Sequence, residues 1–372
     1  MNERWIAERM SRIDASGIRK AFEMAKSMKD PVNLSIGMPN FDADESIKAA
    51  AYEAIREGAN QYSVTMGLPE LREILQQSVD GLGHADRQVI VTSGTAGALM
   101  LAMIAVVNPG DQVIVFDPYF VMYQHQVTMA GGETVLVDTY PDFRIDVSKV
   151  AAAITERTKA IILNSPNNPT GVVASAEEVK ALALLCKERG ILLISDEVYR
   201  AFCFDAPFHS PAEWNEDVLV VDGFSKAYGM TGWRLGFAHG PTRLIQEMTK
   251  LQQFSFVCAP TPLQQAVARG LASGTIDLSG HAREYQRKRD MVVEGLEGLY
   301  ELSRPAGAFY AFPKAPWGTA SEFCAAAIEH ELLIIPGNVF SRRDTHFRIS
   351  YAVSDDVLRR GLEILRKLAN RA

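Results

Sequence analysis

One lysine in this chain stands where an amine can act as a nucleophile. Lys226 follows the apolar run Val218–Val221, in the segment Asp222-Gly223-Phe224-Ser225-Lys226. A Schiff base forms only from a neutral amine, and a site near another cation and out of water lowers the pKa of a lysine. Arg234 is the candidate for that cation. Taken alone, a lysine in a loop with Gly and Ser is more often a solvated surface residue.

A carboxylate ends another apolar run. Asp196 comes directly after Ile191–Ser195, where it would be partly out of water and therefore costly unless it met a cationic partner. A protonated pyridine nitrogen would be such a partner. Tyr199 and Asn168 could then bind a phenolate oxygen on the same ring. A strand-terminal aspartate also caps turns, so this residue by itself leaves both interpretations open.

A third polar segment could bind an anion. Ser93-Gly94-Thr95 opens directly into a predicted helix over Ala96–Val107. Small residues let the backbone approach an anion, which free N–H groups and the helix dipole would stabilise. The segment is therefore a candidate phosphate site. An ordinary Ser/Thr N-cap explains the same residues, since such caps are common.

The elements that must position these residues form one predicted sheet. Between about residues 88 and 240, short β-rich runs alternate with helical patterns, as expected of a largely parallel sheet covered on both faces. The predicted strands are Val89–Thr92, Gln112–Phe116, Thr134–Val137, Ala160–Leu163, Ile191–Ile194, Val218–Val221 and Leu235–Ala238. The predicted helices are Ser46–Glu57, Pro69–Val79, Ala96–Val107, Tyr119–Ala130 and Ala176–Arg189. Ligands bind outside the carboxyl ends of such strands, which places the lysine, the aspartate and the candidate phosphate site at one edge.

We predict an α/β fold, a three-layer sandwich with a mostly parallel central sheet, plus a smaller α+β domain. With 372 residues, the chain is too long for one ordinary compact core. After residue 275 the pattern changes to a long charged helix over Gly280–Leu302, followed by shorter elements. These are Phe323–Glu331, a strand at Leu333–Ile335, a strand at His346–Tyr351 and a helix over Asp355–Asn370. We therefore expect a large domain over 46–284 and a small domain built from 1–45 and 285–372.

Charge and cysteine content argue against several kinds of protein. The 45 acidic and 38 basic residues are interspersed and give a formal net charge of −7, which argues against nucleic acid or an anionic membrane as partner. The four cysteines lie far apart without a Cys-x-x-Cys pair, so we expect neither a disulfide framework nor a zinc site. The sequence has neither a secretory signal nor an apolar run of about 20 residues. A cytoplasmic location is the resulting expectation.

Several segments, in the same order, resemble the class I and II aminotransferases of fold type I, of the aspartate and aromatic aminotransferase kind. The most specific is Ser225–Gly236, which resembles the lysine motif of that family. It is joined by Asn168-Pro169-Thr170-Gly171, Asp196-Glu197-Val198-Tyr199 and Phe347-Arg348-Ile349-Ser350. Similarity extends to Asn33–Pro39, Tyr62-Ser63 and Gly67–Arg72, so nearly the whole chain is covered.

The resemblance implies pyridoxal 5'-phosphate as cofactor, bound by the large domain. Lys226 would form the internal aldimine and later move the proton between substrate carbon and cofactor. Asp196 would pair with the pyridinium nitrogen, Tyr199 and Asn168 would bind the ring hydroxyl oxygen, and Phe120 would stack on the ring. The phosphate would be held by Gly94, Thr95, Ala96, Ser225 and Arg234, with Tyr62 added from the second subunit of a homodimer.

The resemblance also implies how the substrate binds. Arg348 matches the arginine that binds the substrate carboxylate, a role suited to a planar guanidinium that makes two parallel charge-assisted hydrogen bonds. Gly37 would leave room for the substrate beside it and beside Asn168. One departure is visible at Gly223, where many relatives have a phosphate-binding serine; Ser225 would substitute for it. Trp5 and Ile6, near the start of the sequence, would help an N-terminal arm dock on the partner.

The implied reaction transfers an amino group from an L-amino acid to a 2-oxo acid, with 2-oxoglutarate as the expected acceptor, by a ping-pong mechanism. A β-lyase that acts on cysteine conjugates with the same cofactor is the alternative. A nucleotide-binding dehydrogenase is disfavoured because no Gly-x-Gly-x-x-Gly follows a predicted strand. A binding module without turnover is disfavoured because every catalytic position is retained. The amino donor stays open among aspartate, aromatic and methionine-like substrates, since no second cation for a dicarboxylate is identifiable.

Overall fold

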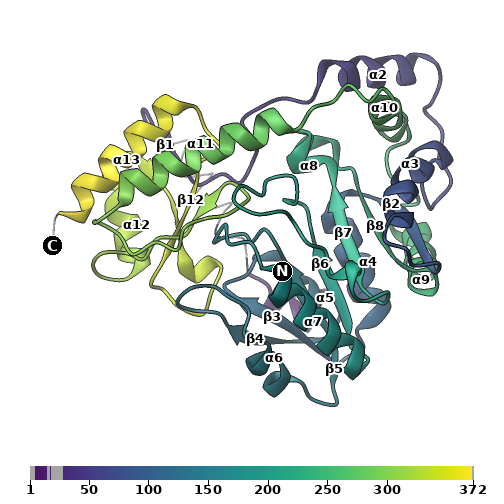
Figure 1. The fold of residues 1–372 in the computed structure, drawn as a ribbon, viewed down its shortest axis with the longest axis horizontal. Coiled ribbons are helices and arrows are strands. Elements are labelled where there is room, and N and C mark those ends of the chain that lie inside the picture. The colour runs from purple at the N-terminus through teal and green to yellow at the C-terminus, as the bar shows by residue number, and fades with distance from the viewer. Residues whose placement is uncertain (1–4, 15–16, 18–27, 371–372) are drawn as a thin grey trace.

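The computed structural model describes residues 5–14, 17 and 28–370, and its central feature is a seven-stranded sheet (Figure 1). In spatial order the strands are β2 (Arg87–Thr92), β8 (Gly236–Pro241), β7 (Leu219–Gly223), β6 (Leu192–Asp196), β5 (Thr158–Asn164), β3 (Gln112–Asp117) and β4 (Glu133–Asp138). Strand β8 runs antiparallel to both of its neighbours, and the other adjacent pairs are parallel. The mostly parallel sheet predicted from the sequence is confirmed. Each predicted run overlaps a strand, although the runs that begin at Ile191, Val218 and Leu235 start one residue before their strands do.

Helices cover both faces of the sheet because successive strand residues point to opposite sides. On one face, Val113 and Val115 pack against helices α4 (Gly94–Val106), α5 (Met122–Met129) and α9 (Thr242–Ser255). On the other face, Ile114 and Phe116 pack against α6 (Val147–Ala153) and α7 (Ala176–Arg189). These two apolar clusters make the three layers that the sequence predicts.

A third group of helices packs at the β2 edge of the sheet. Helices α2 (Glu45–Arg56), α3 (Pro69–Asp80) and α10 (Thr261–Ala272) share an apolar cluster with Val89 and Val91 of β2. The segment between α2 and α3 runs along the outside of this group and carries Tyr62, whose side chain is 82% exposed. Tyr62 therefore lies at the surface of the single chain.

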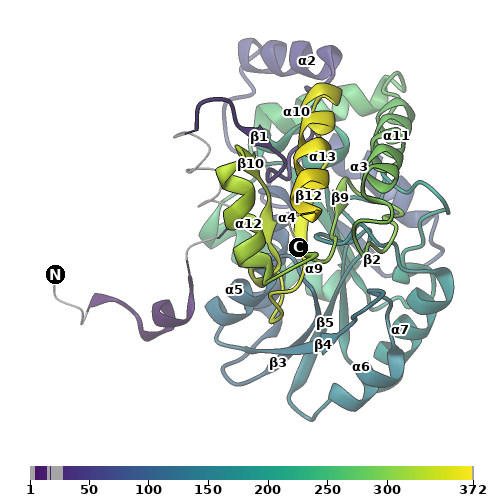
Figure 2. The ribbon, with the colours of Figure 1, turned by 90° about the vertical axis from the view of Figure 1, so that its left-hand side faces the viewer.

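The C-terminal part forms a separate α+β layer. It contains α11 (Ser279–Leu296), β9 (Tyr310–Ala311), α12 (Ala320–Glu329), β10 (Leu332–Leu333), β11 (Ile335–Pro336), β12 (Phe347–Ser350) and α13 (Asp355–Ala369). Figure 2 shows α11, α12 and α13 grouped above strands β3, β4 and β5. The predicted helix over 280–302 is shorter than expected and ends at Leu296. Glu297 has a ψ of 135° and Gly298 a φ of 72°, and the N–H of Leu299 donates to the carbonyl of Leu296 at 3.1 Å, so a turn follows the helix.

The beginning of the chain pairs with this C-terminal layer. Strand β1 (Val32–Asn33) runs parallel to β10, with Val32 opposite Leu332. The backbone N–H of Ser350 also donates to the carbonyl of Leu34. The predicted division into 46–284 and 1–45 with 285–372 stays a prediction; parts of 1–45 and the last two residues lie outside the described ranges, and α11 crosses the boundary at residue 284.

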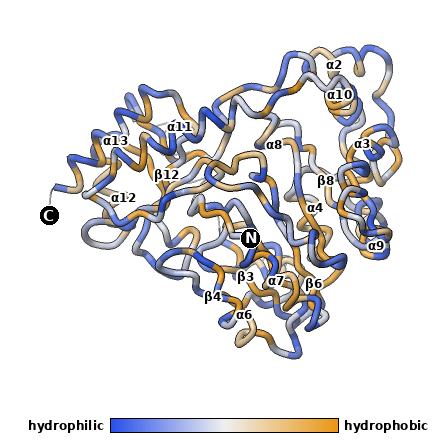
Figure 3. The backbone as a smooth tube through the Cα atoms, in the orientation of Figure 1, coloured by the Kyte–Doolittle hydropathy of each residue, from blue (hydrophilic) through white to orange (hydrophobic). Residues whose placement is uncertain are grey.

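Amphipathic helices complete the exterior. Figure 3 shows hydrophilic and hydrophobic residues alternating along α11 and α13, and the buried residues of α13 are Leu358, Gly361, Leu362, Leu365 and Leu368. Among the helices of the described ranges, none combines the length and the apolar composition that a membrane crossing requires. The short helix η2 (Glu8–Arg12) projects from the body of the molecule in Figure 2, and next to it Trp5 is 80% exposed.

Candidate active site

A cavity of about 740 Å³ lies at the carboxyl ends of the sheet strands. Most of the residues predicted from the sequence meet there, although they come from widely separated parts of the chain. Those that line the cavity are Gly37, Thr95, Ala96, Phe120, Asn168, Asp196, Tyr199, Ser225, Lys226, Arg234 and Arg348. Gly94 lies directly beside Arg234 at the rim, whereas Tyr62 does not reach the cavity in the single chain.

Lys226 is held at the end of β7 by the short helix α8 (Phe224–Ala227). Its Nζ atom donates a hydrogen bond of 2.6 Å to the carbonyl of Gly37. Burial lowers the pKa of Lys226 to about 8, and the positive charges of Arg348 and Arg234 act in the same direction. The amine is therefore easier to deprotonate than an exposed lysine, as the role of a nucleophile requires.

Asp196 is the last residue of β6 and is only 4% exposed. The hydroxyl of Tyr123 donates to its Oδ2 atom at 2.7 Å, and the N–H of Val198 donates to Oδ1 at 3.3 Å. Burial raises the pKa of Asp196 to about 6, while the two hydrogen bonds oppose that rise. This carboxylate would gain from a cationic partner in the cavity.

Arg348 is fixed in a buried position on β12. Its Nη1 atom donates to Oδ1 of Asn168 at 2.9 Å and its Nη2 atom donates to the carbonyl of Ser35 at 2.7 Å. Its guanidinium also lies over the rings of Tyr310 and Phe340, at 4.7 and 4.6 Å from the ring centres. The Nε atom is buried without a hydrogen-bond partner among the described residues. The planar group is thus preorganised, with donor capacity left for an anion.

Tyr199 faces the same cavity through its hydroxyl. That hydroxyl lies 2.8 Å from the hydroxyl of Tyr310. Burial raises the pKa of Tyr199 well above its ordinary value, so the phenol keeps its proton and can donate. A Cβ atom at Gly37 would collide with the Tyr310 hydroxyl, which explains why glycine is required at this close approach.

The candidate phosphate site lies at the start of helix α4. Gly94 has a φ of 69°, and a Cβ atom there would lie 2.7 Å from Nη2 of Arg234. The Ser93 side chain makes no capping hydrogen bond to the helix, so the structure does not support the N-cap interpretation. The first N–H groups of α4 and the guanidinium of Arg234 together suit an anion.

Gly223, the departure from the family pattern, lies in a tightly packed place. A Cβ atom there would be 3.1 Å from the Cα atom of Gly236 and 3.2 Å from Cγ2 of Thr95. A serine at this position would therefore require its neighbours to shift. Ser225, which lines the cavity, is the hydroxyl available on this segment.

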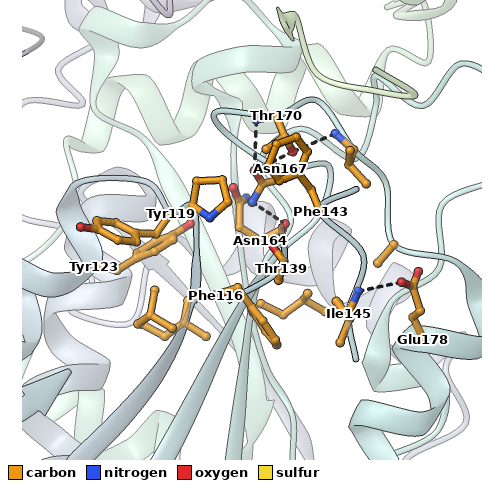
Figure 4. A pocket seen from close by; sticks show the side chains of 16 residues that line it. Phe116, Tyr119, Tyr123, Thr139, Phe143, Ile145, Asn164, Asn167, Thr170 and Glu178 are labelled. Atoms are coloured by element: carbon orange, nitrogen blue, oxygen red, sulfur yellow. Dashed lines mark hydrogen bonds between the residues drawn. The ribbon is translucent and has the colours of Figure 1, made fainter. Parts of the chain in front are cut away.

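Three residues of the site were missed in the sequence. Tyr123 donates to Asp196, Tyr310 contacts Tyr199, and Nδ2 of Asn164 donates to the carbonyl of Asp196 at 3.1 Å. Tyr123 and Asn164 also line a second, much smaller cavity of about 30 Å³ behind the site (Figure 4). The position of Asn164 at the end of an apolar run was a usable signal; the two tyrosines gave none, since their partners are distant in sequence.

Comparison with known proteins agrees with this geometry. Residues 29–365 match the family model described as aminotransferase class I and II. The chain belongs to this family. It is therefore a pyridoxal-phosphate-dependent aminotransferase, and the family and the enzyme class predicted from the sequence are confirmed.

Relatives of this aminotransferase match over almost their whole length. It is 35% identical to a probable aspartate aminotransferase of Methanocaldococcus jannaschii, covering 98% of this chain and 99% of the relative. It is 39% identical to the aspartate/prephenate aminotransferase of Thermus thermophilus, covering 95% and 94%. The structure of a Thermus thermophilus aspartate aminotransferase with maleate superposes with a TM-score of 0.93 at 35% identity, covering 98% and 99%. The fold is thus that of fold type I.

Proposed function

We propose that this aminotransferase binds pyridoxal 5'-phosphate on Lys226 and transfers the amino group of an L-amino acid to a 2-oxo acid, with 2-oxoglutarate as acceptor. The observation that carries the proposal is that the low-pKa amine of Lys226, the buried carboxylate of Asp196 and the preorganised guanidinium of Arg348 all face one cavity.

The residues present fit this cofactor. The uncapped start of α4, with the space that Gly94 leaves beside Arg234, suits the phosphate. Asp196 provides the anionic partner that a protonated ring nitrogen needs, and the phenol of Tyr199 can donate to the ring hydroxyl oxygen beside Asn168. Phe120 lines the same cavity and would cover one face of the ring.

When bound, pyridoxal phosphate supplies an electron sink for the negative charge left at the substrate α-carbon. The task of Asp196 is to keep the ring nitrogen protonated. Since its pKa is about 6 without a cationic partner, the carboxyl is already mostly ionised near neutral pH. A facing cation would extend the ionised range to lower pH.

Lys226 would move the proton of the reaction. Its free Nζ atom would act as the general base that takes up the proton of the substrate α-carbon and, as the conjugate acid, would give that proton back to complete the amino transfer. A pKa near 8 is well suited to both directions of this transfer. Arg348 orients the substrate through its α-carboxylate, so that the α-hydrogen faces Nζ.

Both half-reactions would use the same cavity in turn, which makes the expected kinetics ping-pong. We also propose that the active form is a homodimer, in which Tyr62 of each subunit reaches the phosphate site of the other. The named relatives are aminotransferases that act on aspartate or prephenate, and these names do not favour the β-lyase alternative.

The proposal is tested on the purified protein loaded with pyridoxal phosphate. Borohydride reduction followed by peptide mass analysis should place the cofactor on Lys226, and Lys226→Ala should prevent the labelling. Lys187→Ala, which removes an exposed lysine, is the matched control and should leave the labelling of Lys226 unchanged. Initial rates with an amino-acid panel and 2-oxoglutarate should give parallel lines in double-reciprocal plots. Label on another lysine, or intersecting lines, would refute the corresponding part of the proposal.

A further inference from the structure

Tyr123, whose hydroxyl contacts the buried carboxylate of Asp196, has no role in the proposed function. Tyr123 lies on α5, and its hydroxyl donates to Oδ2 of Asp196 at 2.7 Å. Tyr123 is 2% exposed and Asp196 is 4% exposed, so bulk water does not compete for this contact.

We propose that Tyr123 is a positioning residue for amino transfer, whose hydroxyl holds the Asp196 carboxylate in place and in its ionised form at the cavity wall. This inference rests on the proposed function, because it assigns to Tyr123 the support of a group that acts on the cofactor ring. Tyr123 itself would touch neither the substrate nor the reacting atoms.

The Asp196 carboxylate has few hydrogen-bond donors among the described residues. An ionised carboxylate out of water requires hydrogen-bond donors or a cation. Within the described ranges, the donors to the Asp196 side chain are the Tyr123 hydroxyl at 2.7 Å and the Val198 N–H at 3.3 Å, and no ion pair includes it. The phenol is therefore the closer of two contacts that favour the charged form.

The charges around Asp196 act on its ionisation in both directions. Asp222, at the end of the neighbouring strand β7, disfavours ionisation of Asp196, whereas Lys226 across the site favours it. The charge of Asp222 is offset by Arg200, whose Nε atom lies 2.6 Å from its Oδ2 atom. Among the described residues, the other titratable or charged groups near the pair are Glu197 and Tyr199 beyond β6, His125 on α5, and Tyr310, Arg234 and Arg348 across the cavity. The Tyr123 hydroxyl thus favours the charge that Asp222 and burial oppose.

Tyr123 keeps its proton and is held in place by packing. Burial and the nearby Asp196 raise the pKa of Tyr123 well above its ordinary value, so the phenol keeps its proton. Its ring packs edge-on against Phe120, with ring centres 5.7 Å apart. Removal of the hydroxyl alone would leave this packing in place, which makes Tyr123→Phe a clean substitution.

The test compares Tyr123→Phe with the wild-type holoenzyme and with Tyr140→Phe. Tyr140 is a matched control because it also has a buried hydroxyl, bonded to Ser341 and outside the cavity.

In Tyr123→Phe we expect kcat to fall about tenfold with KM little changed, and the acid-side midpoint of the pH profile to move to higher pH. The pH at which the visible absorbance of bound cofactor changes should also differ from wild type. Tyr140→Phe should show none of these changes. An unchanged kcat and unchanged pH profiles in Tyr123→Phe would overturn the proposal.

A double-mutant cycle separates positioning from general destabilisation. If Tyr123 acts through Asp196, adding Tyr123→Phe to Asp196→Asn should lower kcat no further. A full tenfold loss in the Asp196→Asn background would overturn the proposal, because it would show an independent effect. Failure of the proposed function itself would be recognised separately, since the wild-type protein would then neither bind pyridoxal phosphate nor transfer an amino group.

Discussion

At the scale of single residues, burial shifts the pKa values of Lys226 and Asp196 in opposite directions. It lowers the pKa of Lys226 to about 8 and raises the pKa of Asp196 to about 6. Both shifts follow from the cost of charge out of water, which disfavours the cationic amine and the anionic carboxylate alike. The result is a base and an acid that both titrate close to neutral pH.

The first prediction concerns the pH dependence of turnover. As the pH falls through about 6, Asp196 takes up a proton, which in the proposed function would remove the charge that holds the ring nitrogen protonated. A bound cationic ring lowers this pKa further, so we expect the acid limb of kcat at or below pH 6. The limb should be absent in Asp196→Asn, whose remaining activity is low throughout. Profiles measured over about pH 5 to 9 decide the point; an acid limb that persists in Asp196→Asn would assign it to another group.

The second prediction concerns substrate orientation. Arg348→Lys keeps a cation but loses the planar fork that can bind a carboxylate with two parallel hydrogen bonds. We expect KM for the amino donor to rise at least about tenfold, while the dissociation constant of pyridoxal phosphate stays within about twofold of wild type. Cofactor titration and initial rates on the same preparation provide both values. Weakened cofactor binding with unchanged KM would assign Arg348 a different role.

At the scale of elements, the positions of the strands were easier to predict than the strands with which they pair. Runs such as Gln112–Phe116 and Ala160–Leu163 are short, apolar and β-branched, and each lies within a strand. The antiparallel direction of β8 could not be predicted, because an apolar run does not indicate whether a strand is parallel or antiparallel to its neighbours. Helices α9 and α10 were not predicted either, and the predicted strand over 333–335 divides into β10 and β11, which pair with different strands.

The same limit applies to the site. Polar residues directly after apolar runs, such as Asp196 and Lys226, could be predicted because the carboxyl ends of parallel strands share one edge. Tyr123 and Tyr310 could not, because their partners are 73 and 111 residues away and a tyrosine within an apolar segment gives no sign of what its hydroxyl contacts.

The third prediction concerns the start of helix α4. Gly94→Ala puts a Cβ atom into the space beside Arg234 and strains a backbone with φ of 69°. Gly110→Ala is the matched control, since Gly110 has a φ of 84° but open space around it. Both should lose about 1 to 2 kcal/mol of stability in denaturant unfolding of the protein without cofactor. Only Gly94→Ala should weaken pyridoxal phosphate binding, by about tenfold or more. Equal affinities in the two variants would contradict this site for the phosphate.

At the scale of the whole molecule, the cavity combines residues of the central sheet with residues that lie outside this sheet. Gly37 and Arg348 come from the two ends of the chain, whereas Lys226 and Asp196 come from the central sheet. The domain boundaries, the dimer and the cytoplasmic location stay predictions.

The fourth prediction tests the shared site of the proposed dimer. Tyr62→Ala should weaken cofactor binding about tenfold, because it would remove the charge-assisted hydrogen bond that the proposed dimer supplies from the other subunit. Tyr52→Ala, which removes another exposed tyrosine, should leave affinity unchanged. When Tyr62→Ala and Lys226→Ala proteins are mixed and allowed to exchange subunits, hybrid dimers should regain sites of wild-type affinity and activity. If activity only averages that of the two parents, Tyr62 does not act across subunits.

The pairing of β1 with β10 has a consequence for how the protein is made. Leu332, the partner of Val32, is added to the growing chain 300 residues after Val32. Throughout that interval the segment carrying the Gly37 carbonyl lacks its sheet partner, although the central sheet can already assemble. A nascent chain arrested before residue 332 would therefore contain the lysine and the aspartate without the wall that Ser35, Gly37 and Arg348 complete. We therefore expect the cavity wall to be complete only after the chain has been synthesised through Arg348.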